Sequence, residues 1–175
     1  MLKLKYPKDL KKFENYDLGH SDWFLIDQQL INAFAKLSGD DQWIHVDAER
    51  ALNEMPEGKT IAHGLLSLCI SPSLGKNKIH IENLKQTFNY GIDKVRFISP
   101  VKVGSFIRLK SKIAEVTIRD DNTVLVRIER TMEIKGFKKL AMYAETLSLM
   151  YSGVIELIEK AFNKAYKRFL QTFII

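Results

Sequence analysis

The sequence has little cysteine, little proline and no long apolar run, and each shortage excludes a class of protein. Cys69 is the only cysteine among 175 residues, so no disulfide can form within the chain, which is typical of a reducing compartment. The four prolines and nine glycines do not gather into a linker or repeat. No stretch reaches the roughly 18 uninterrupted apolar residues of a membrane-spanning helix. We therefore expect a single globular domain in the cytoplasm.

The N-terminus and the cysteine show no sign of a special role. Lys3, Lys5 and Lys8 are not followed by an apolar segment, so no secretory signal is expected. Cys69 lies inside the apolar run Leu65–Ile70, and we expect it to be a small buried side chain rather than a nucleophile.

The chain is basic, with 27 Lys and Arg residues against 21 Asp and Glu residues and a formal net charge of +6. A lysine-rich surface is one interpretation, and attraction for a polyanion such as coenzyme A is another. No helix-turn-helix, zinc-finger or RNP-like pattern is visible, so we expect no nucleic-acid partner. The hydrophobic fraction of 46% is ordinary for one folded domain.

The first third of the chain predicts a strand and a capped helix. The segment 1–19 has no clear pattern, and we expect an extended, partly ordered lead-in. Residues 23–26 have the composition of a strand. Asp27 is a good N-cap for a helix that ends at Gly39. The apolar residues of that helix follow helical spacing, which predicts one buried face: Leu30, Ile31, Phe34 and Leu37.

The rest of the chain predicts a central helix followed by an antiparallel meander. The apolar segment Gly64–Leu74 reads as a helix wrapped by other elements. Val124, Val126 and Ile128 alternate with Leu125, Arg127 and Glu129, as in a strand with one buried face. Short connections favour antiparallel neighbours, so the class is α+β. The four strand-like runs are Lys85–Phe97, Ser105–Ile118, Thr123–Ile134 and Lys139–Met150.

The segment from Ser38 to Leu66 carries the groups that proton transfer needs. Asp40 and His45 lie five residues apart in a polar loop, and an imidazole titrates near neutral pH. Gly64 opens the central helix, where unpaired N–H groups can stabilise an oxyanion. A purely structural interpretation is also open, in which Asp40 caps a helix and His45 bonds to backbone. Asp47 is expected to cap a short helix over residues 48–52.

Three motifs in this order resemble one family. Asp40-x-x-x-x-His45, followed by Ala62-His63-Gly64-Leu65-Leu66, is similar to the MaoC-like (R)-specific enoyl-CoA hydratases, also called hydratase 2. The stretch 42–47 and the later stretch 89–97 are closer to the nodulation-protein-N-like branch. The resemblance covers about Trp23 to Met150.

The resemblance implies a fold and a reaction. The fold would be a single hotdog, a curved antiparallel sheet wrapped around a central helix. The reaction would be reversible hydration of trans-2-enoyl-CoA to (3R)-hydroxyacyl-CoA, with Asp40 and His45 as the acid–base pair. No metal and no cofactor are expected, because coenzyme A is part of the substrate. The remaining residues expected to bind substrate or line the oxyanion site are Gly64, His63, Gln42, Asn89 and Tyr90.

The resemblance also implies a homodimer, and two other functions stay open. One is hydrolysis of an acyl-CoA thioester, and the other is a non-catalytic acyl-CoA-binding or membrane-peripheral module. We expect a dehydratase domain over residues 1–152 and an amphipathic, basic helix over residues 153–175. That helix would pack against the sheet or across a dimer, or else contact a membrane surface.

Overall fold

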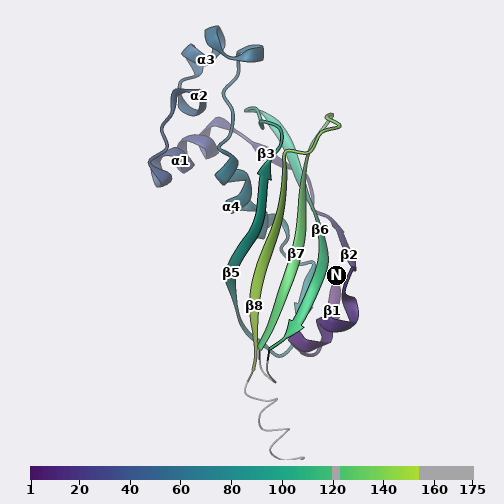
Figure 1. Cartoon of the computed structure of the whole chain (residues 1–175). Coiled ribbons are helices and arrows are strands. Elements are labelled where there is room, and N and C mark those ends of the chain that lie inside the picture. The colour runs from purple at the N-terminus through teal and green to yellow at the C-terminus, as the bar shows by residue number, and fades with distance from the viewer. Residues whose placement is uncertain (120–122, 154–175) are drawn as a thin grey trace, which may run out of the picture.

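A long antiparallel sheet forms most of the molecule (Figure 1). The computed structural model describes residues 1–119 and 123–153. The strands run in the order β6-β7-β8-β5, and β2 (Asp17–His20) and β3 (Phe24–Ile26) both pair with β6. The four long strands are β5 (Leu84–Phe97), β6 (Ser105–Ile118), β7 (Thr123–Ile134) and β8 (Met142–Ser152). The predicted antiparallel pairing is confirmed, and β6, β7 and β8 form a meander. β5 differs from the prediction, because it pairs with β8 and not with β6, the next strand along the chain.

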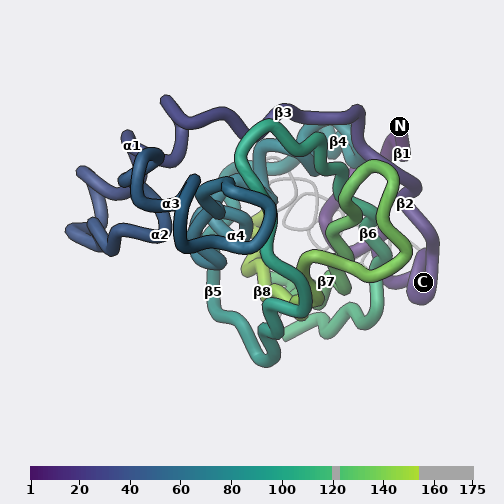
Figure 2. Tube along the Cα trace, turned by 90° about the horizontal axis from the view of Figure 1, so that it is seen from above, coloured from purple at the N-terminus to yellow at the C-terminus, as the bar shows by residue number. Residues whose placement is uncertain are grey.

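The alternation of apolar side chains explains how the sheet acquires one buried face. Val124, Val126 and Ile128 of β7 are all buried, as their spacing predicts. Ile113 of β6 lies directly opposite Ile128 and is fully buried. Seen from above, the backbone of the sheet is strongly curved (Figure 2).

The central helix α4 (Gly64–Leu74) packs against the inner face of this sheet. Its predicted bounds are confirmed, and a curved antiparallel sheet around one helix is the hotdog arrangement. The expectation of a helix covered on most sides is wrong, because Leu65 is 56% exposed. Cys69 is exposed as well and is not the buried side chain that the sequence predicts. Nothing within the described residues covers this side of the helix.

The helices α1 (Gln28–Ser38), α2 (Trp43–Val46) and α3 (Ala48–Glu54), with the short 3-10 helix η2 (Pro56–Gly58), lie beyond one end of the sheet (Figure 1). Asp27 caps α1 as predicted, since its Oδ1 accepts a hydrogen bond from the Leu30 N–H at 2.8 Å. Asp47 caps α3 in the same way. Ile31 is fully buried, but Leu37 is 84% exposed, so the predicted buried face of α1 is shorter than expected.

The N-terminal segment is more ordered than the sequence predicts. β1 (Leu2–Leu4) pairs in parallel with β4 (Ile79–Ile81), and the 3-10 helix η1 (Pro7–Phe13) follows it. Leu10 of η1 is fully buried against the lower end of the sheet. The expected loose lead-in is therefore wrong, because long-range pairing and burial stabilise a segment whose local pattern is weak.

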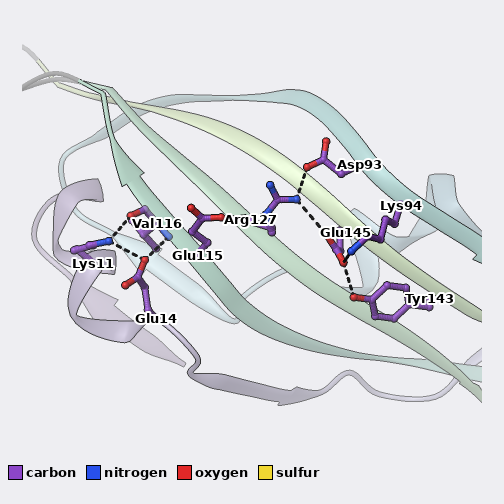
Figure 3. A network of polar contacts seen from close by, with 9 residues as sticks. All are labelled: Lys11, Glu14, Asp93, Lys94, Glu115, Val116, Arg127, Tyr143 and Glu145. Atoms are coloured by element: carbon purple, nitrogen blue, oxygen red, sulfur yellow. Dashed lines mark hydrogen bonds and ion pairs between the residues drawn. The ribbon is translucent and has the colours of Figure 1, made fainter.

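Ion pairs on the outer face tie the strands together (Figure 3). Arg127 of β7 contacts Asp93 of β5, Glu115 of β6 and Glu145 of β8. Lys94 and the Tyr143 hydroxyl both bond to Glu145 Oε1 at 2.8 Å. Burial and the neighbouring Glu145 raise the pKa of Tyr143 to about 12. Through Arg127 these contacts join all four long strands on the outer face of the sheet.

No helix among residues 1–119 and 123–153 is both long enough and apolar enough to cross a membrane. The C-terminal helix expected over residues 153–175 falls almost entirely outside the described residues, so that helix and the domain boundary at residue 152 stay predictions.

Candidate active site

Three separate segments place the candidate acid–base residues beside one another. α1 ends at Ser38, and Gly39 takes a left-handed conformation (φ 76°) while its N–H donates to the Ala35 carbonyl. This turn delivers Asp40 directly after the helix. His45 comes from the following short helix α2, and His63 immediately precedes α4.

His45 is held in one tautomer. Its side chain is 7% exposed, and its Nδ1 lies 2.7 Å from the Ile61 carbonyl oxygen. Because a carbonyl can only accept, Nδ1 must carry the proton, and Nε2 of the neutral ring keeps a free lone pair. Gln28 supports the same segment, since its Nε2 donates to the His45 carbonyl at 2.7 Å.

His63 is held in the other tautomer, with the proton on Nε2. It is 2% exposed, and its Nε2 donates to the backbone carbonyl of Asp40 at 2.8 Å. Its buried Nδ1 has no hydrogen-bond partner in the described part of the chain. The ring stacks on His45, with centroids 3.7 Å apart, and Phe34 packs on it at 5.0 Å. His63 therefore links Asp40 to His45 physically.

Asp40, His45 and His63 each offer one atom, and these atoms lie within 4.8 Å of one another. Asp40 is exposed while both imidazoles are buried, so the cluster is reached from the carboxylate side. The donor types suit a metal, but the two ring planes differ by only 27°. Nearly parallel rings direct their lone pairs side by side, whereas a shared ion must lie in both ring planes. The arrangement therefore does not favour one ion bound by both imidazoles.

A cavity of about 280 Å³ adjoins this cluster. His45, Gly64, Ser67 and Phe97 all line it. A Cβ on Gly64 would lie 2.6 Å from the Phe97 ring, so any larger residue here would have to displace that ring. The first N–H groups of α4 have no partner within the helix, and Gly64 lines the cavity, so its N–H is a candidate donor to a ligand oxygen there.

The structure separates the remaining predicted site residues from this cavity. Gln42 is exposed and is the N-cap residue of α2. Asn89 lines a different cavity, beneath the second half of α4. Tyr90 is 51% exposed and lies under the guanidinium of Arg119.

The sequence analysis did not single out Ser67 or Gln28. Ser67 lies three residues after Gly64 on the same helix, and a polar residue within the apolar run Leu65–Ile70 was the available signal. Gln28 bonds to the His45 carbonyl and accepts from Thr60 Oγ1, but no local pattern indicates these contacts between distant segments.

The family model described as "MaoC like domain" matches residues 12–134. The chain belongs to this family. A relative named 3-hydroxyacyl-thioester dehydratase Z, from Mycobacterium tuberculosis, is 41% identical over 79% of this chain and 91% of its own length. Nodulation protein N from Rhizobium leguminosarum is 38% identical over 77% of this chain and 84% of its own length.

A MaoC-like hydratase also shares the fold. The unliganded R-hydratase PhaJ1 from Pseudomonas aeruginosa superposes with a TM-score of 0.60 at 23% identity, covering 76% of this chain and 78% of that one. The resemblance that the sequence motifs indicate, and the hotdog fold it implies, are thus confirmed. This member of the MaoC-like family is a hydro-lyase, an enzyme that adds water to its substrate or removes it.

Proposed function

We propose that the chain hydrates trans-2-enoyl-CoA reversibly to (3R)-hydroxyacyl-CoA, with Asp40 and His45 acting on one water. The observation that carries this proposal is the cluster of Asp40, His45 and His63 beside the cavity at Gly64. The thioester substrate is supported by the name of the 41% identical relative. The (3R) configuration follows the resemblance of the Asp40-x-x-x-x-His45 motif to the (R)-specific hydratases.

The geometry accounts for both halves of the reaction. As the water oxygen bonds to C3, the pair takes one proton from it, and His45 Nε2 is free to accept because Nδ1 is committed to Ile61. The pair then returns one proton to C2. Between these steps negative charge builds on the thioester oxygen, and the Gly64 N–H donates to it. No redox cofactor and no metal enter this scheme.

The experiment is the loss of conjugated enoyl-thioester absorbance when the protein meets crotonyl-CoA, followed by chiral analysis of the product. Rapid loss with a (3R) product is expected. Release of free CoA thiol instead would establish hydrolysis and overturn the proposal.

We keep the cytoplasm as the proposed location, on the ground of the single cysteine.

We further propose that two copies of the chain form a homodimer along β5 and α4. Within the described residues β5 pairs only with β8, so its other edge is open. This strand exposes Phe88 (51%) and Ile92 (48%), and α4 exposes Leu65 beside it. An open, apolar strand edge favours pairing with another chain. Sedimentation equilibrium is expected to give twice the chain mass, and Ile92→Glu to shift it toward the monomer; a wild-type monomer would contradict the dimer.

A further inference from the structure

A belt of polar side chains crosses the interior of the sheet. One hydrophobic cluster fills its upper part, with Leu109, Met132 and Ala144, and a second fills its lower part, with Ile113, Ile128 and Met150. The polar belt lies between the two clusters and is spread over three neighbouring strands. Its members are Ser111 of β6, Arg130 of β7, and Thr146 and Ser148 of β8. Ser111 lies directly opposite Arg130, whereas Thr146 and Ser148 lie opposite Ile128 and Val126.

Arg130 is the charged residue of this belt, and it occupies an inward position. Inward residues of β7 alternate regularly, and Arg130 interrupts the apolar series between Ile128 and Met132. Its neighbours across the sheet are the small residues Ser111 and Ala144, which leave room for the guanidinium. Arginine in such a place is costly unless it is paired.

The guanidinium of Arg130 is only partly satisfied. Nε donates to Thr146 Oγ1 at 3.0 Å, and Nη1 contacts the Ser71 carbonyl at 3.5 Å. A guanidinium has five donor hydrogens, and no carboxylate of residues 1–119 or 123–153 forms an ion pair with this one. Burial without a compensating anion lowers the pKa of Arg130. Donors and positive charge are therefore left for a ligand.

Two cavities give a ligand access to Arg130. One of about 420 Å³ and one of about 270 Å³ are both lined by Arg130 and Pro72. Asn89, Thr146 and Ser148 add polar groups to the smaller cavity, and Leu68 and Leu147 add apolar surface. The smaller cavity thus combines apolar side chains with the guanidinium of Arg130, and this combination suits an apolar chain that ends in an anion.

The smaller cavity lies farther along α4, toward its C-terminus, than the cavity at His45. Ser67 lines the cavity at His45, and the next residue, Leu68, lines the cavity at Arg130. From Gly64 to Ser71 the helix rises about 10 Å, at ~1.5 Å per residue. An extended chain advances at most ~3.5 Å for every three bonds. An acyl chain that reaches from Gly64 to the level of Ser71 therefore needs about eight or nine bonds.

We propose that this enzyme accepts acyl thioesters whose chain carries a carboxylate at its far end, and that Arg130 binds this carboxylate. The inference rests on the proposed function for the position of the thioester. A carboxylate is the chemistry that fits, because it accepts two parallel hydrogen bonds from a guanidinium and neutralises its charge. Arg130 is a specificity residue and takes no part in the proton transfers.

The test compares binding of two saturated, unreactive ligands by calorimetry, decanedioyl-CoA and decanoyl-CoA. Charge-assisted hydrogen bonds predict that wild type binds decanedioyl-CoA about 10- to 100-fold more tightly than Arg130→Gln does. Decanoyl-CoA should bind the two proteins alike. Equal affinity of wild type for both ligands, or an unchanged preference in Arg130→Gln, would overturn the proposal.

Control variants separate specificity from folding and from general charge. Arg130→Met keeps the apolar volume and removes the charge, so it should fold at least as well as wild type and lose the same preference. Arg108→Gln makes the matched change on the outer face, where Arg108 pairs with Glu133, and should keep the preference. If Arg108→Gln lost it equally, Arg130 would not be the determinant.

Two further measurements separate this inference from the proposed function. Crotonyl-CoA is too short to reach Arg130, so its hydration by Arg130→Gln should match wild type. If no hydration occurs in any protein but decanedioyl-CoA still binds through Arg130, the proposed function fails and the carboxylate site stands. Free decanedioate is the last ligand: binding as tight as that of the thioester would overturn the assignment to an acyl chain.

Discussion

His45 and His63 stack with ring centroids 3.7 Å apart, and one ring N–H of each donates a hydrogen bond to a backbone carbonyl. The carbonyl that binds His63 belongs to Asp40, so the same contact that orients the second imidazole also sets the backbone of the carboxylate. Two buried rings thus hold Asp40 and the free Nε2 of His45 in one geometry. The predictions below test what this arrangement does.

Removing either member of the proposed acid–base pair should strongly reduce turnover without unfolding the protein. Asp40→Asn and His45→Gln are expected to lower kcat by about 10²–10⁴-fold, because each removes a positioned proton-transfer group. The Gln side chain can still donate to the Ile61 carbonyl, so His45→Gln should stay folded. Asp41→Asn, the same charge change at the next residue, is the control. Full activity in Asp40→Asn and His45→Gln would mean that the reaction is carried elsewhere.

Gly64→Ala should damage both stability and rate. The new methyl group would meet the Phe97 ring at 2.6 Å, and overpacking of this kind typically costs about 1–3 kcal/mol of unfolding free energy. The displaced ring would also narrow the cavity at His45. Thermal unfolding and kcat/KM with crotonyl-CoA measure the two effects. The double variant Gly64→Ala with Phe97→Leu should regain stability; if it does not, the clash is not the cause.

Low pH should destabilise the folded protein, because protonation of Glu145 weakens its contacts on the outer face of the sheet. Hydrogen bonds from Lys94 and Tyr143 lower the pKa of Glu145 below 4.5, its ordinary value. A carboxyl whose pKa is lower in the folded state contributes stability above its unfolded pKa, and this contribution is lost as pH falls below 4.5 through the folded value. Glu145→Gln should therefore flatten the fall in melting temperature below that pH. Glu82→Gln is the surface control, and an identical acid profile for wild type and Glu145→Gln would contradict the prediction.

Chelators should leave the activity unchanged. The stacked rings of His45 and His63 do not converge on one ion, and the scheme assigns every proton transfer to side chains. Prolonged dialysis against EDTA, with metal content measured before and after, is the experiment. A loss of rate that zinc restores would show that the cluster of Asp40, His45 and His63 works as a metal site.

Much of the fold follows from local pattern. The bounds of β6, β7 and α4 and the caps at Asp27 and Asp47 are readable because alternation, helical spacing and capping act within a few residues. The pairing of β1 with β4 is not readable, since it joins segments that are distant along the chain. The exposure of Leu37 and Cys69 could not be predicted for a related reason. The burial of a side chain depends on which elements pack against it, and these cannot be read from the local sequence.

The sequence by itself determined the types and the order of the main elements, and the spacing of Asp40 and His45 with the glycine at position 64 indicated the candidate reacting groups. Only the tertiary structure decided that His63 bridges Asp40 and His45, that Gln28 supports them, and that Asn89 belongs to another cavity. It also placed Arg130 between two hydrophobic clusters, where no carboxylate of residues 1–119 or 123–153 forms an ion pair with it. The physical reason is that spacing governs local hydrogen bonds, whereas the charge and space around a side chain come from strands and helices that meet only in the folded chain.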